Sequence, residues 1–177
     1  AGAALTAEHV ATHLIGGAGD DGFRAVSGTG HTFEGGLGDA IFNISALSTP
    51  GQIVSGDYAG LHGGAGFDTL AVHDHLDLTA LSAGTVSGID HIALDEGKSL
   101  TLTSDLLDSI LDNGSDTLEI SGGGAGSTLS LSLSGGDVLI DTGAQAQGHD
   151  GTMYNVYNVE RDDSSTIQLL IHNVTGV

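Results

Sequence analysis

The feature that most constrains this chain is residues 63–71, which read Gly-Gly-x-Gly-x-Asp-x-apolar-x. The glycines permit the positive φ angles of a tight turn, and they let carbonyl oxygens approach closely because no Cβ intervenes. Asp68 adds a carboxylate, so the turn offers the oxygen ligands that a hard cation such as Ca²⁺ prefers. Leu70 follows in a short strand and is expected to point into a core. The segment therefore predicts a metal-binding turn that leads into a strand.

Two further copies of the pattern lie upstream. Residues 16–24 have Asp21 in the carboxylate place and Phe23 in the apolar place. Residues 35–42 read as a damaged copy that is one residue short, so that Asp39 comes early. The first two copies begin about two nonapeptides apart, which is the length of one β-roll turn. The interval to the third copy is longer and indicates a loop around Pro50-Gly51. The candidate calcium-binding residues are Gly16, Gly17, Gly19, Asp21, Gly36, Gly38, Asp39, Gly63, Gly64, Gly66 and Asp68.

The charge of the chain is strongly one-sided. It has 23 Asp and Glu residues against 3 Lys and Arg, for a formal net charge of −20. This excludes nucleic acid as a partner, because binding it needs basic side chains, and it disfavours anionic membrane surfaces. Such a charge density repels itself in a compact state. We therefore expect a chain that is loose without calcium and ordered with it.

Two other absences bear on the class of protein. The chain has no cysteine, so disulfides do not stabilise it and bound metal ions are the expected substitute. It has no apolar run long enough to cross a bilayer, so no membrane insertion is expected.

The C-terminal part alternates apolar and polar residues, which predicts short strands. These strands are 76–79, 92–94, 100–103, 118–120 and 129–133. The interval from Leu76 to Leu94 equals two nonapeptides, and so does the interval from Leu102 to Ile120. This spacing favours a solenoid whose turns all have that length, although short strands and turns also suit an antiparallel β-sandwich.

One helix and one hairpin complete the expected elements. Residues 103–111 begin with N-capping residue types and carry an apolar stripe of Leu106, Leu107, Ile110 and Leu111. Asn113-Gly114 is expected to end this helix. Residues 151–157 and 166–171 are expected to form a closing β-hairpin with residues 161–165 at its tip.

With two good nonapeptides and one degraded copy in an acidic chain without cysteine, the sequence resembles the RTX (repeats-in-toxin) family of type I-secreted bacterial proteins. Residues 63–177 resemble a module of large RTX adhesins, through Leu76-Asp77-Leu78-Thr79, Ser87-Gly88-Ile89-Asp90-His91-Ile92 and the later Leu-Thr-Leu-Thr run. The resemblance implies a secreted, extracellular protein of the cell surface that folds when it binds Ca²⁺. It also implies a cell-surface glycan or protein as a further partner.

The fold class expected from these patterns is all-β: a parallel β-roll or β-solenoid with a short helix and a C-terminal β-hairpin. The alternative is a β-sandwich that follows a short β-roll. Residues 1–72 are expected to form a glycine-rich calcium-binding repeat region and residues 73–177 a β-rich module with the closing hairpin, unless the two are one continuous domain.

The function expected is that of a calcium-stabilised structural or adhesive domain without enzymatic activity. The alternative is a C-terminal secretion and folding domain of an exported hydrolase or toxin. An enzyme is disfavoured because no nucleophile-elbow motif is present.

Histidines offer a second candidate metal site. His73, His75 and Asp77 would alternate along the outer face of one strand, and a turn of two nonapeptides would place His91 beside them. Such a cluster would suit zinc, copper or nickel. The favoured interpretation is a solvent-facing polar surface.

Overall fold

The structure is a computed structural model that describes residues 2–111 and 114–177. Most of these residues form strands in three sheets. The first sheet contains, in spatial order, β1 (Ala4–Ala7), β3 (Gly22–Ala25), β5 (Ile41–Ile44), β8 (Thr69–Val72), β11 (His91–Leu94), β13 (Thr117–Gly122), β17 (Thr166–His172), β16 (Met153–Glu160) and β15 (Val138–Gln147). The second contains β10 (Val86–Ser87), β7 (Tyr58–Ala65), β4 (His31–Leu37) and β2 (His13–Gly17). The third contains β14 (Thr128–Ser132), β12 (Ser99–Thr103), β9 (His75–Asp77) and β6 (Gln52–Ile53).

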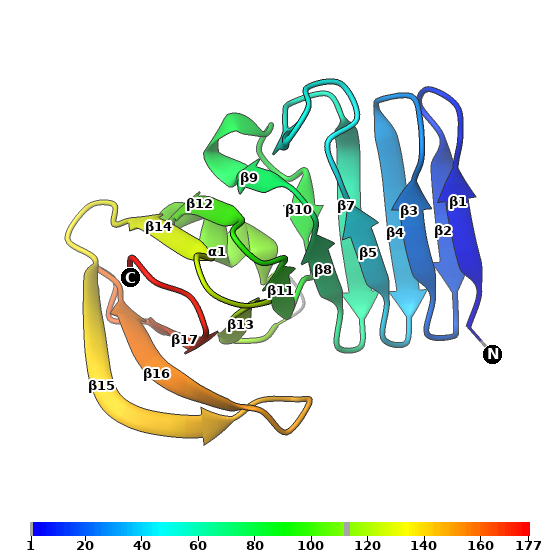
Figure 1. The fold of residues 1–177 in the computed structure, drawn as a ribbon. Coiled ribbons are helices and arrows are strands. Elements are labelled where there is room, and N and C mark those ends of the chain that lie inside the picture. The colour runs from blue at the N-terminus through cyan, green and yellow to red at the C-terminus, as the bar shows by residue number, and fades with distance from the viewer. Residues whose placement is uncertain (1, 112–113) are drawn as a thin grey trace.

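The chain winds between these sheets. From β1 to β8 successive strands alternate between the first and second sheets, apart from the short β6, and each circuit adds a parallel strand beside the previous one. In Figure 1 these strands form two layers that start at the N-terminus. From β9 to β14 the third sheet takes the place of the second, apart from the short β10. The predicted all-β class and the parallel pairing are confirmed, and the antiparallel sandwich does not describe these strands.

The core lies between the layers and is built from residues in register. Phe23 pairs with Phe42, which pairs with Leu70, and Leu70 pairs with Ile92. Each of these side chains is fully buried, because alternate residues of a strand face the same side and parallel register stacks them. The rings of Phe23 and Phe42 lie 5.0 Å apart at an interplanar angle of 16°. One apolar cluster runs from Ala7 to Ile171.

The predicted helix and hairpin are both present. Helix α1 (Ser104–Ile110) buries Leu107 and Ile110. Asn113, expected to end this helix, lies outside the described residues. Strands β16 and β17 form the predicted antiparallel hairpin. Arg161 at its turn donates from Nη2 to the Ser104 carbonyl oxygen (2.8 Å), which ties the hairpin to the start of the helix.

The constant turn length predicted from the leucine spacing was wrong. Leu76 pairs with Leu100 and not with Leu94, and Leu100 pairs with Leu129. Each later circuit contains an insertion, such as α1 or the 3₁₀ helix η1 (Leu78–Ala80), so the circuits differ in length. The predicted strand 76–79 accordingly ends at Asp77, whose Oδ1 accepts the Thr79 N–H (2.9 Å) and caps η1.

None of the helices in the described part of the chain combines the length and apolar character that a membrane crossing needs.

Candidate metal-binding turns

The three glycine-rich copies form consecutive turns from the second sheet to the first. Gly17, Gly36 and Gly64 occupy equivalent places where β2, β4 and β7 end. These turns lie at the lower edge of the two layers in Figure 1. Gly36 shows why glycine is needed here. Its φ is +96°, and a Cβ added to it would stand 2.3 Å from the carbonyl oxygen of Gly17 in the turn beside it.

The same crowding recurs at the fourth residue of the second and third copies. A Cβ on Gly66 would lie 2.3 Å from the Gly38 carbonyl oxygen, and one on Gly38 would lie 2.8 Å from the Gly19 carbonyl oxygen. The glycines predicted from the sequence are therefore brought together, turn upon turn. Their close approach leaves the backbone carbonyls of neighbouring turns near one another.

The second copy is not one residue short, which corrects the prediction. Since Gly22 pairs with Ile41 and Ile41 with Thr69, the residue before each of them occupies one equivalent place. That place holds Asp21, then Ala40, then Asp68. The second copy therefore has its full length but carries alanine where the others carry the carboxylate. Asp39 stands one place earlier.

The two carboxylates at this place are buried. Asp21 is 3% exposed and Asp68 is 0% exposed. Oδ1 of Asp21 accepts the Ala3 N–H (2.6 Å), and Oδ1 of Asp68 accepts the Ala40 N–H (2.8 Å). The second oxygen of each, Oδ2, has no hydrogen-bond partner. A buried carboxylate oxygen without a partner is costly, so these two oxygens indicate where a ligand would bind.

Each of these oxygens faces a backbone carbonyl of the following turn. A Cβ on Gly16 would lie 2.3 Å from Asp21 Oδ2 and 2.6 Å from the carbonyl oxygen of Gly35. A Cβ on Gly63 would likewise lie 2.5 Å from Asp68 Oδ2 and 1.9 Å from the carbonyl oxygen of Gly88. A carboxylate oxygen and a carbonyl oxygen therefore converge twice, in each case beside the first glycine of a copy.

The carboxylates of Asp20 and Asp39, each one place before the buried position, accept hydrogen bonds from backbone N–H groups. Asp20 Oδ1 accepts the N–H of Asp39 (3.0 Å), and Asp39 Oδ1 accepts the N–H of Phe67 (2.8 Å). These contacts link each turn to the next. Asp39, which was predicted as a metal ligand, thus holds the third turn through a hydrogen bond.

A fourth turn, at residues 87–90, was missed as part of the site. Gly88 provides the carbonyl oxygen beside Gly63, and Asp90 Oδ2 accepts the Asp68 N–H (3.0 Å). The signal lies in the tripeptide Asp90-His91-Ile92, where an aspartate comes two residues before a core residue, as in Asp68-Thr69-Leu70. The glycines that identify the other copies are largely missing here.

The buried position changes the acidity of Asp68. Burial and, to a smaller extent, the negative charges of Asp90 and Asp39 raise the pKa of its carboxyl to about 6, although the hydrogen bond from the Ala40 N–H acts in the opposite direction. The ionised form is therefore disfavoured at this site unless a positive charge is near.

The alternative arrangement, a histidine cluster, does not form. His91 pairs with Thr69 and not with His73, because the circuit is longer than two nonapeptides. His73 contacts Asp95 (Nδ1 to Oδ2, 2.9 Å), and His75 contacts Ser99 (Nδ1 to Oγ, 2.9 Å). Among residues 2–111 and 114–177, no three His, Cys, Asp or Glu side chains gather as a metal-binding group. A cation at the glycine-rich turns would thus depend on backbone carbonyl oxygens for further ligands.

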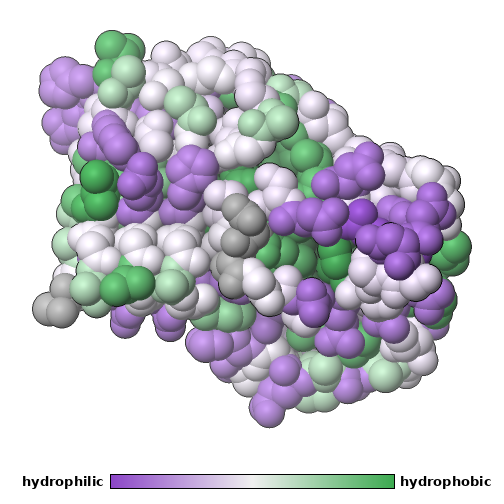
Figure 2. Space-filling model, turned by 180° about the vertical axis from the view of Figure 1, so that it is seen from behind, coloured by the Kyte–Doolittle hydropathy of each residue, from purple (hydrophilic) through white to green (hydrophobic). Residues whose placement is uncertain are grey.

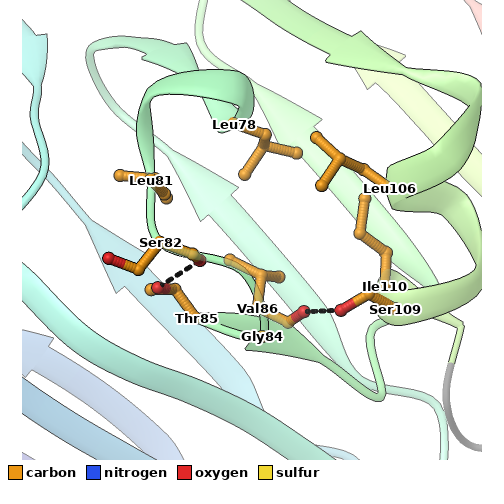
Figure 3. Close-up of a pocket in the computed structure, with 9 residues that line it drawn as sticks. All are labelled: Leu78, Leu81, Ser82, Gly84, Thr85, Val86, Leu106, Ser109 and Ile110. Carbon is orange, nitrogen blue, oxygen red and sulfur yellow. Dashed lines mark hydrogen bonds between the residues drawn. The ribbon is translucent and has the colours of Figure 1, made fainter.

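A small cavity elsewhere in the molecule offers less. Figure 3 shows an apolar cavity between η1 and α1, lined by Leu78, Leu81 and Leu106 among others. Its volume is about 20 Å³, which is room for one water molecule. In Figure 2 the hydrophilic residues of the rear face lie in several separate groups, with pale and hydrophobic areas between them. The glycine-rich turns remain the best candidate site.

Comparison of the chain with protein-family models, with curated proteins and with solved structures gave no match.

Proposed function

We propose that this chain is a calcium-stabilised structural or adhesive domain of a secreted bacterial RTX surface protein, and that its winding sheets are a parallel β-roll continued as a β-solenoid. The observation that carries the proposal is the pair of buried, unpartnered Oδ2 atoms of Asp21 and Asp68. Each faces a carbonyl oxygen of the next turn. Ca²⁺ prefers such mixed carboxylate and carbonyl ligands.

Two groups of residues would hold the ions. One is Asp21 with the Gly35 carbonyl, and the other is Asp68 with the Gly88 carbonyl. Bound calcium would supply the positive charge that both buried carboxylates lack, and it would offset part of the net charge of −20. Extracellular calcium modules bind with Kd on the order of 10⁻⁴–10⁻³ M, so such a domain would become ordered outside the cell and stay loose inside it.

The test is a calcium titration of the chain followed by calorimetry and thermal unfolding. We expect calcium at about 100 times Kd to raise the free energy of unfolding by about 2.7 kcal/mol for each ion. Asp21→Asn and Asp68→Asn should each remove one ion and its share of the stabilisation. Asp105→Asn, the same change at an exposed aspartate on α1, is the matched control and should remove none.

The result that would overturn the proposal is an equal unfolding transition in calcium and in EDTA. Calcium binding that is unchanged in both Asp21→Asn and Asp68→Asn would overturn the placement of the ions.

A further inference from the structure

The tip of the β15–β16 hairpin reaches back to the third glycine-rich turn. Its strands end at Gln147 and begin again at Met153, so residues 148–152 form the tip. In Figure 1 this hairpin extends from the far end of the molecule toward the lower edge, where the glycine-rich turns lie. The tip and the turn are distant in sequence.

An aromatic stack joins the two. The rings of Phe67 and His149 lie 3.9 Å apart between centroids, at an interplanar angle of 10°. Phe67 stands between Gly66 and Asp68, and its own N–H donates to Asp39 Oδ1. The stack and the Asp39 hydrogen bond therefore both hold Phe67, the residue next to Asp68.

A buried carboxylate fixes the tip in place. Glu119 on β13 is 6% exposed, and its Oε1 accepts the N–H of His149 (2.8 Å). Burial raises the pKa of Glu119, and hydrogen bonds from the His149 N–H and the Tyr154 hydroxyl partly offset this. A Cβ on Gly148 would stand 2.8 Å from Glu119 Oε2 and 2.5 Å from the Tyr154 ring. The tip fits this carboxylate closely, with no room for a side chain at Gly148.

We propose that the hairpin tip is a clamp on the third glycine-rich turn, and that His149 and Glu119 are positioning residues for a calcium ion at Asp68. The inference rests on the proposed calcium function. His149 and Glu119 do not touch the ion; they act through Phe67, which sets the backbone next to Asp68. Because coupling between two sites is reciprocal, calcium at Asp68 should in turn hold the tip in place.

The experiment uses the full chain with Asp21→Asn, so that the remaining calcium binding belongs to the third turn. Calorimetry should show that His149→Ala weakens this binding by about 5-fold or more, the lower end of typical coupling between sites. His149→Phe keeps an aromatic ring for the stack and should restore the affinity. His9→Ala, at an exposed histidine between β1 and β2, is the matched control and should change nothing.

Hydrogen exchange gives the second readout. In the chain with the native tip, calcium should slow exchange of the amides of residues 148–152, and in His149→Ala it should not. Gly148→Ala, which crowds Glu119 and Tyr154, should behave like His149→Ala. Equal affinity in all variants together with calcium-independent exchange at the tip would overturn the clamp.

The two proposals fail in different ways. If the chain binds no calcium at all, the proposed function fails. The clamp is then judged by exchange at the Phe67 and Asp68 amides, which His149→Ala must accelerate if the tip holds the turn, and an unchanged rate there would overturn it.

Discussion

Asp68 is the residue on which most of the interpretation depends. It is fully buried, one oxygen accepts the Ala40 N–H, and the other has no partner. Its pKa of about 6 lies above the ordinary value of 3.8. A raised pKa in the folded chain means that protonation stabilises the fold. The stabilisation that comes from protonating Asp68 is therefore fully present below about pH 4, and it is lost as the pH rises through about 6.

Because ionisation of Asp68 destabilises the fold, the variant Asp68→Asn gives a prediction. Its side chain resembles the protonated carboxyl and keeps an oxygen for the Ala40 N–H. In EDTA at pH 7 the variant should be more stable than the parent chain, by at most roughly 3 kcal/mol. The difference should shrink toward zero between pH 6 and pH 4. In excess calcium at pH 7 its sign should reverse, because the variant loses a ligand.

Urea unfolding at several pH values, with and without calcium, measures both effects. A variant that is less stable than the parent chain in EDTA at pH 7 would contradict the assigned pKa. A variant that stays more stable in calcium would show that Asp68 is not a ligand.

Single residues also show which parts of the site could be predicted from the sequence. Asp68, Leu70 and Phe23 could be assigned from the nonapeptide, because its glycines fix which side chain follows the turn. Ala40 could not be aligned from spacing alone, since Asp39 next to it offered a carboxylate. Only the strand register showed which of the two faces the interior. Asp90 was missed as a site residue because its turn keeps the aspartate but not the full set of glycines.

At the scale of elements, the repeating unit of the fold is one turn with the strands on either side of it. Each inner carboxylate accepts an N–H from the turn before it: Asp21 from Ala3, Asp68 from Ala40, and Asp90 from Asp68. Ala40 interrupts this series, so the second turn offers no side-chain acceptor to the first. The stack of turns is therefore regular in backbone but has a gap in its carboxylates.

Filling that gap should add a calcium site. Ala40 is 1% exposed and stands between Asp21 and Asp68 in the stack. In EDTA we expect Ala40→Asp to destabilise the chain by a few kcal/mol, because it buries another carboxylate. In calcium we expect one more bound ion than in the parent chain.

Native mass spectrometry in calcium would count the ions, and Ala40→Asn would control for size without charge. An unchanged ion count for Ala40→Asp would contradict the alignment of the second copy.

Elements were predicted better than their spacing. Alternating leucines identified β12, β13 and β14, and the helix stripe identified α1, because periodicity is local. The length of a circuit is not local. It depends on insertions such as η1 and α1, which pack on the strands and leave no mark on the strand pattern itself. A constant period of two nonapeptides could therefore not hold beyond the first circuit.

At the scale of the whole molecule, burial of the main apolar cluster stabilises the fold and repulsion within a net charge of −20 opposes it. We expect added NaCl to stabilise the calcium-free chain, because the screening length falls from about 30 Å at 0.01 M salt to about 3 Å at 1 M. A gain of about 1 kcal/mol would raise the unfolding temperature by about 2–4 °C for a chain of this size. With calcium bound the gain should be smaller.

Thermal unfolding across a salt series in EDTA measures this effect. Choline chloride in place of NaCl separates screening from binding of a specific cation. A lower unfolding temperature at high salt in both series would show that charge repulsion does not limit stability.

Contacts at this scale were the least accessible to sequence reasoning. The stack of Phe67 on His149 and the hydrogen bond from His149 to Glu119 join segments that share no motif. His149 lies among glycine and aspartate and is most simply read as part of a loop. Only the long reach of the hairpin brings it to the third turn.

The direction of the inner hydrogen bonds has a consequence for assembly. In each of the three hydrogen bonds accepted by Asp21, Asp68 and Asp90, the donor N–H lies earlier in the chain than the carboxylate that accepts it. A chain that orders itself from its C-terminal end would thus have the carboxylate acceptor already in place when the amides of Ala3, Ala40 and Asp68 arrive. Ordering from the opposite end would leave these three amides without their side-chain acceptor until the next carboxylate is in place.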